Sequence, residues 1–244
     1  MRWLLICLAI AGCARAGKEN SIIGGLTDAR PGGDAETVPA PDGSPFDAPP
    51  QQVTLTQTAI NGITKNNSFG CVQSSGVTLQ NSYYRVFKLA DYAITTTLHV
   101  TQVDFGIETA AAGGSAGSQP ATVHIGTYAG TPGAATLDLS MARMVNSMDI
   151  KIPDGDATGM TVPITGDIAP TTSVIVELAI PDGTAAGNEF FAGTNTDVER
   201  APGYTLGPDC QINSPTSMQS IADDNMFGTV HLVMSVTGMT DLPN

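Results

Sequence analysis

The feature that constrains the fold most is a series of short segments in which polar and apolar residues alternate. Residues 52–56 (QVTLT) show this pattern. It recurs in five later segments, residues 83–89, 97–107, 121–128, 173–178 and 230–236. A period of two is typical of β-strands with one buried face, and clusters of Gly, Pro, Asn and Asp between the segments indicate turns. Since no segment after residue 20 keeps a helical spacing over three turns, we predict an all-β fold of about ten strands, a single jelly-roll-like β-sandwich.

Composition supports this fold class and argues against one class of partner. The 244 residues include 23 Asp and Glu against 10 Lys and Arg, which gives a net charge of −13. A nucleic-acid-binding surface needs clustered cations, so nucleic acid is not an expected partner. Only 14% of the residues are charged, while Gly (27) and Pro (16) are plentiful. These proportions are more typical of an exported all-β protein than of a helical cytosolic enzyme.

The N-terminus has the character of an export signal. An apolar run over residues 4–11 is too short to span a bilayer, because a spanning helix needs roughly 20 apolar residues. The sequence Ile-Ala-Gly-Cys at residues 10–13 resembles the lipobox of bacterial lipoproteins. This resemblance implies a signal peptide over residues 1–12, a lipid on Cys13 and, because Ala14 and not Asp follows, anchoring in the outer membrane, with its periplasmic and surface faces both open.

An ordinary signal-peptide cleavage site is the alternative. Residues 14–16 read Ala-Arg-Ala, which fits the A-x-A pattern of such sites. Cleavage there would produce a secreted protein without a lipid.

Residues 13–50 differ in composition from the rest of the chain. Pro, Gly, Ala and Asp dominate, and residues 17–50 carry six acidic and two basic side chains. No apolar periodicity is present that could offset the entropy lost on ordering. We predict a disordered tether over residues 13–50 that separates a folded domain, residues 51–244, from the membrane.

The cysteines predict a single disulfide. Cys7 is removed with the signal peptide and Cys13 is used by the lipid, which leaves Cys71 and Cys210. One remaining pair in an exported protein most simply forms one bridge, here closing a loop of 139 residues.

Four segments resemble, in this order, a β-sandwich module of exported bacterial proteins such as extracellular proteases and cell-surface proteins. They are residues 81–87 (NSYYRVF), 103–108 (VDFGIE), 186–195 (AGNEFFAGTN) and 209–212 (DCQI). The resemblance spans about residues 65–239 and implies an accessory β-sandwich in a surface context. It implies no activity, because the matching positions are aromatic and Gly-rich structural ones.

Acidic residues near turns provide a candidate calcium site. The residues are Asp154, Asp156, Asp182, Asp223 and Asp224. Calcium takes about six to eight oxygen ligands, which loop carboxylates and carbonyls can supply. The alternative is ordinary turn chemistry, and neither Asp-rich segment is an EF-hand loop.

Other side chains offer weaker candidates. A zinc site would need His99, His124 and His231 on one face of the fold. Rings on the surface could stack on a sugar, and the candidates for this role are Tyr84, Tyr92, Tyr128 and Tyr204. The alternation instead directs Tyr83, Phe87 and Phe105 toward the core.

The sequence thus predicts a non-enzymatic, lipid-anchored cell-envelope protein with a β-sandwich head that binds or structures something. The expected partners are the membrane, through the lipid, and a glycan or an envelope protein. No cofactor is expected, and a structural calcium ion is the one candidate. A carbohydrate- or calcium-dependent adhesive module is the alternative. A secreted hydrolase is the third hypothesis, and a glycosidase would need two carboxylates about 5 to 10 Å apart in a cleft. The candidates are Glu108, Glu177, Glu189 and Glu199.

Overall fold

A computed structural model of the chain describes residues 50–58 and 62–241. The predicted signal peptide, Cys13 and all but the last residue of the predicted tether lie outside the described residues. None of the described helices is long and apolar enough to cross a membrane.

The described residues form an all-β domain with one short α-helix. Its elements in chain order are β1 (Gln51–Thr56), β2 (Asn81–Lys88), η1 (Leu89–Tyr92), β3 (Leu98–Ala111), β4 (Ser118–Tyr128), η2 (Leu139–Met141), β5 (Ala142–Pro153), β6 (Gly155–Val162), β7 (Gly166–Ile168), β8 (Ser173–Ile180), β9 (Glu189–Ala192), β10 (Thr194–Asn195), β11 (Tyr204–Gly207), η3 (Pro208–Cys210), β12 (Ile212–Ser217), α1 (Met218–Asp224), β13 (His231–Leu232) and β14 (Met234–Thr240). The predicted all-β class is therefore confirmed.

The first sheet is organised around β3, which is 14 residues long. The order β1-β14-β3-β6 is antiparallel throughout, and β7 and β9 also pair with β3. β7 pairs with the beginning of β3 and β9 with its end. Because β3 has two neighbours on each edge, its outward-facing side chains lie in the middle of the sheet.

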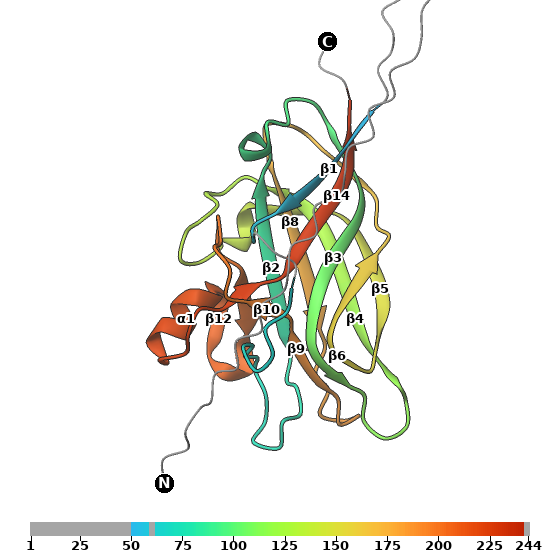
Figure 1. The fold of residues 1–244 in the computed structure, drawn as a ribbon, viewed down its shortest axis with the longest axis vertical. Helices are drawn as coiled ribbons and strands as arrows, with labels where there is room; N and C mark the ends of the chain where they lie inside the picture. The colour runs from blue at the N-terminus through green and yellow to red at the C-terminus, as the bar shows by residue number, and fades with distance from the viewer. Residues whose placement is uncertain (1–49, 59–61, 242–244) are drawn as a thin grey trace, which may run out of the picture. The chain divides into compact units, whose positions relative to one another are not determined.

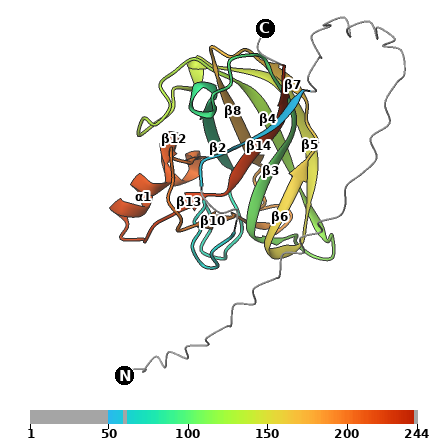
Figure 2. The ribbon, with the colours of Figure 1, turned by 45° about the horizontal axis from the view of Figure 1, so that its top comes forward.

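The second sheet has six strands in the order β12-β11-β2-β8-β4-β5, and β10 and β13 form a separate two-stranded sheet. β14 and β3 of the first sheet lie over β8 and β4 of the second (Figure 1), and α1 lies beside β12 and β13 (Figure 2). The two large sheets thus form the layers of a sandwich.

The core lies between these layers and follows the alternation in the sequence. Tyr83, Phe87, Val103 and Phe105 are all buried in one apolar cluster together with Val176 of β8. The prediction that Tyr83, Phe87 and Phe105 face the core is confirmed. The residues between them, such as Asp104, must point to the outside of the sandwich.

A second apolar cluster covers part of the outer face of the second sheet. It contains Tyr84 and Val86 of β2, Ile175 of β8 and Leu137 of the β4–β5 loop. The loop therefore folds back over the sheet and protects these outward-facing side chains from water.

The predicted disulfide between Cys71 and Cys210 is confirmed, with a Cα–Cα distance of 5.6 Å. It connects the loop before β2 to η3. The Asn81 side chain fixes the Cys71 end, since its Oδ1 accepts the Cys71 amide at 2.8 Å and its Nδ2 donates to the Cys71 carbonyl at 2.9 Å.

Candidate functional site

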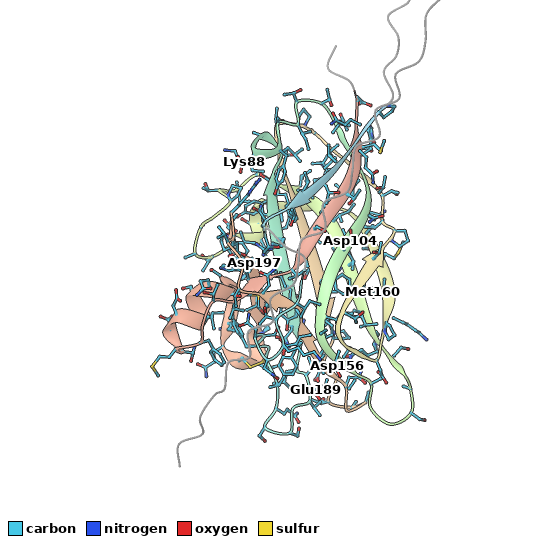
Figure 3. The ribbon with its side chains drawn as sticks, in the orientation of Figure 1. Lys88, Asp104, Asp156, Met160, Glu189 and Asp197 are labelled. Atoms are coloured by element: carbon cyan, nitrogen blue, oxygen red, sulfur yellow. A yellow bond between two sulfur atoms is a disulfide. The ribbon has the colours of Figure 1, made fainter. Side chains whose placement is uncertain are left out.

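A small groove on the outer face of the first sheet holds a carboxylate in a fixed position. It has a volume of about 260 Å³ and crosses β14, β3 and β6. We call it the Asp104 groove. Its lining residues are Ile63, Asp104, Phe105, Gly106, Gly159, Met160, Thr161, Val233 and Ser235. Figure 3 shows Asp104 on β3 beside Met160 on β6, with Asp156 toward the far end of β6.

Neighbouring side chains orient the Asp104 carboxylate. The Thr161 hydroxyl donates to its Oδ1 at 2.5 Å, and the Gln102 amide donates to its two oxygens at 3.2 and 3.0 Å. Thr161 and Ser235 lie directly opposite Asp104 on the two neighbouring strands. A carboxylate accepts about four hydrogen bonds, so Oδ2 keeps capacity for a ligand, as does the oxygen of Thr161.

Two glycines form the floor beside this carboxylate, and only one of them is open on this face. Gly106 of β3 lies directly opposite Gly159 of β6. At Gly159 an added Cβ would meet no atom closer than 3.9 Å, whereas at Gly106 it would come within 3.1 Å of Val233 and 3.2 Å of Ile63. The floor is therefore open over β6 and bounded by apolar side chains over β3.

A buried ion pair lies at a distance from the groove and has a different character. The Arg85 side chain is fully buried, and its Nη1 lies 2.5 Å from Glu199 Oε1 and donates to the Ala201 carbonyl at 2.5 Å. Its Nε and Nη2 both donate to the Leu232 carbonyl. His231 completes the group, with Nε2 3.4 Å from Glu199 Oε2 and Nδ1 against the Asp197 carbonyl.

Burial acts against both charges of this pair. It lowers the pKa of the Arg85 guanidinium, which the Glu199 charge opposes, and it raises the pKa of the Glu199 carboxyl, which Arg85 and His231 oppose. Each nitrogen of the Arg85 guanidinium has an acceptor within the protein, and these contacts fasten the 197–201 loop and β13 to β2.

His99 forms a second charged cluster near the C-terminus, on the surface. Its Nδ1 lies 2.8 Å from Asp167 Oδ1 and its Nε2 lies 3.2 Å from Asp241 Oδ1. A neutral imidazole donates from only one nitrogen, so this arrangement requires the protonated ring. The contact with Asp167, followed by that with Asp241, raises the pKa of His99 above its ordinary value.

We expect the stability contributed by this cluster to be present at acid pH and to be lost as the pH rises through the folded-state pKa of His99, because that pKa exceeds the unfolded-state value. An NMR titration should place the His99 pKa above about 6.5, and Asp167→Asn should lower it. The melting-temperature difference between wild type and His99→Gln should be larger near pH 5 than near about pH 8. An equal difference at both pH values would contradict the arrangement.

The structure does not bring the predicted calcium ligands together. Within the described residues, no group of three or more His, Cys, Asp or Glu side chains is placed to hold a metal ion. Asp154 accepts the Ala112 amide at 2.7 Å, Asp182 accepts the amide of Thr184 at 2.8 Å, and Asp223 accepts from the Gln219 side chain at 2.7 Å. Asp156 is exposed on β6 and Asp224 is exposed at the end of α1. Calcium binding stays a prediction of the sequence.

The three histidines also lie apart. His99 belongs to the surface cluster, His231 to the buried group around Arg85, and His124 is on β4 opposite Glu177 of β8.

The prediction of surface tyrosine rings is wrong for three of the four residues. Tyr84, Tyr128 and Tyr204 are only 2%, 3% and 1% exposed. The β4–β5 loop covers them, and burial raises the pKa of Tyr204 to about 12. Tyr92 is partly buried and donates to the Thr56 carbonyl at 2.7 Å.

The four candidate glutamates have four different surroundings. Glu108 accepts three backbone amides of residues 66–68, at 2.8 to 3.1 Å. Glu177 accepts from the Tyr84 hydroxyl at 2.7 Å, Glu189 begins β9, and Glu199 pairs with Arg85. Burial, followed by the neighbouring Glu177 carboxylate, raises the pKa of the Tyr84 hydroxyl.

The Asp104 groove was not predicted, although part of its signal was present in the sequence. Alternation through residues 103–107 directs Asp104 and Gly106 to the outer face. Thr161 and Gly159 could not be placed beside them, because no strand was predicted over residues 155–162.

Comparison with known proteins finds no matching family model and no matching curated protein. Two solved structures resemble the chain. One contains the cysteine protease and lectin-like domains of Cwp84, a surface layer associated protein of Clostridium difficile, with 14% identity and a TM-score of 0.44 over 67% of this chain and 33% of that chain. The other is the same clostridial protease after propeptide cleavage, with 14% identity and a TM-score of 0.42 over 67% of this chain and 37% of that chain. The chain spans about a third of the length of these proteins, and a likeness of this size says nothing about a ligand or an activity.

Proposed function

We propose that this chain is an exported, lipid-anchored, non-enzymatic protein whose head binds a carbohydrate in the Asp104 groove. The observation that carries the proposal is the Asp104 carboxylate, which Thr161 and Gln102 hold in one orientation near the open floor at Gly159. A sugar offers adjacent hydroxyls, which can donate to Asp104 Oδ2 and to the Thr161 oxygen together. A few well-placed polar groups on an apolar surface are what an orienting ligand site requires.

Apolar side chains flank these polar groups. Ile63 and the buried Val233 line the groove over Gly106, and Ile63 can contact the C–H face of a sugar ring, with the open floor at Gly159 allowing the ring to approach the sheet. Met160 lies opposite Phe105 and packs against the core, so only its backbone borders the groove. Asp104 is the one carboxylate among the described residues that line the groove. Since glycoside hydrolysis normally uses two, this favours binding over cleavage.

Export is supported by the disulfide. The Cys71–Cys210 bridge is typical of proteins that fold in an oxidising compartment. It agrees with the export signal expected from residues 1–12.

The test of the proposed function is retention of the purified full-length protein by insoluble chitin, cellulose, xylan and peptidoglycan. We expect saturable binding to one of these polymers. Asp104→Asn removes a charged acceptor and should weaken binding at least about tenfold, and Gly159→Val should weaken it by filling the groove without touching the polar groups. The matched control is Asp156→Asn, because Asp156 is an exposed carboxylate on β6, the strand of Gly159, but lies outside the groove. This variant should bind like wild type. Failure of every polymer, or full binding by both groove variants, would refute the proposal.

Lipid anchoring is tested separately at Cys13. Because the thiol is the expected attachment point, Cys13→Ser should move the protein from the membrane fraction to the soluble fraction of the cell envelope. Fractionation followed by immunoblotting measures this. Membrane retention of the variant would count against the lipobox and in favour of another mode of attachment.

A further inference from the structure

A larger groove lies on the outer face of the second sheet. It has a volume of about 630 Å³ and crosses β5, β4, β8 and β2. We call it the Asp149 groove, and its lining residues are Gln80, Ser82, Pro120, Ala121, Thr122, Asp149, Ile150, Lys151, Ala179, Ile180 and Pro181.

The chemistry of the Asp104 groove is repeated here. Thr122 of β4 lies directly opposite Asp149 of β5, as Thr161 lies opposite Asp104. The Thr122 hydroxyl donates to Asp149 Oδ1 at 2.8 Å. In both grooves a cross-strand threonine therefore fixes one carboxylate oxygen, while the other carboxylate oxygen and the threonine oxygen keep capacity for hydrogen bonds from a ligand.

The floor of the Asp149 groove is also formed by small side chains. Ser82 of β2 and Ala179 of β8 are directly opposite each other and continue across the sheet to Thr122 and Asp149. The β4–β5 loop covers the neighbouring part of this face, around Tyr84 and the other buried tyrosines, but its residues do not line the groove. This half of the face is thus left open by the fold.

The two grooves lie on opposite outer faces of the sandwich, with the core between them. Asp104 is on the first sheet and Asp149 on the second, and their side chains point away from the shared core. Stacked sheets are about 10 Å apart, so a ligand in one groove does not obstruct the other.

From this repetition we infer that the Asp149 groove is a second carbohydrate site, which makes the head bivalent and able to cross-link polysaccharide chains. The inference rests on the proposed function of the Asp104 groove. One difference concerns the class of sugar. Lys151 lines only the Asp149 groove and forms no ion pair in the described part of the chain, so this site also suits a sugar that carries a carboxylate or sulfate.

The test is calorimetric titration of the full-length protein with the hexasaccharide derived from whichever polymer binds the protein in the retention assay. We expect two ligands per wild-type chain, one for Asp104→Asn, one for Asp149→Asn, and none for the double variant, with Asp156→Asn equal to wild type. Thr122→Val should lower the affinity of the Asp149 groove alone. Melting temperatures of all variants establish that they are folded.

The outcomes separate the two claims. One ligand per wild-type chain, lost in Asp104→Asn and unchanged in Asp149→Asn, would overturn the second site and leave the proposed function in place. No titratable binding by any protein would overturn both. As an independent readout, the wild type should make a solution of the soluble polymer turbid, whereas either single variant should not. Equal turbidity with Asp149→Asn would contradict cross-linking through this groove.

Discussion

Replacing Arg85 by Met is expected to lower the free energy of unfolding by about 3–5 kcal/mol. The reason is that the buried Glu199 carboxyl would lose the cation that offsets its desolvation, and the Leu232 and Ala201 carbonyls would lose their donors. Urea unfolding followed by circular dichroism measures the effect, since Trp3, the one tryptophan, lies in the predicted signal peptide.

The control for this prediction is the double variant Arg85→Met with Glu199→Gln. Removing both charges leaves no unpaired ion, and Gln can still accept the Gly203 amide that Glu199 accepts at 3.2 Å. The double variant should therefore be more stable than Arg85→Met alone. If it is less stable, the buried charge is not the source of the loss.

Removing the disulfide by Cys71→Ser and Cys210→Ser is expected to cost about 2–5 kcal/mol of stability. The bridge closes a loop of 139 residues, so the unfolded chain without it gains conformational freedom. Reducing the wild type should lower its unfolding midpoint in urea to that of the double variant. A reducing agent should leave the midpoint of the double variant unchanged. Equal midpoints for the oxidised wild type and the double variant would show that the bridge does not constrain the chain as described.

Sequence patterns predicted the strands that bury at least one face and failed for strands that are mostly exposed. The alternating segments correspond to β1, β2, β3, β4 and β8, and the last segment is divided at Val233 into β13 and β14. β5 and β6 were missed because most of their residues are exposed or only partly buried. Most residues of β5 are exposed, so its sequence, ARMVNSMDIKIP, shows no regular burial pattern.

The sequence did not predict the surroundings of a side chain where a loop or a distant segment determines them. Alternation correctly separates Tyr83 from Tyr84, but only the tertiary structure shows that the β4–β5 loop buries the outward-facing one. Arg85 shares the core-facing side of β2 with Tyr83 and Phe87, which was a signal that a buried charge needs a partner. Its partner Glu199 comes from a loop more than a hundred residues away, where no sequence pattern could identify it.

The most direct test of the carbohydrate site is an NMR titration of the isotope-labelled, full-length protein with the hexasaccharide derived from the polymer that binds it. We expect saturable shifts of the amide signals of Asp104, Gly106, Gly159 and Thr161, with matching shifts at Thr122 and Asp149 when the second groove fills. In Gly159→Val the signals of Asp104, Gly106 and Thr161 should stay in place, while those of Thr122 and Asp149 still move. Shifts confined to other surfaces, with the Asp104 groove signals unchanged at saturation, would contradict the assignment of the groove as a carbohydrate site.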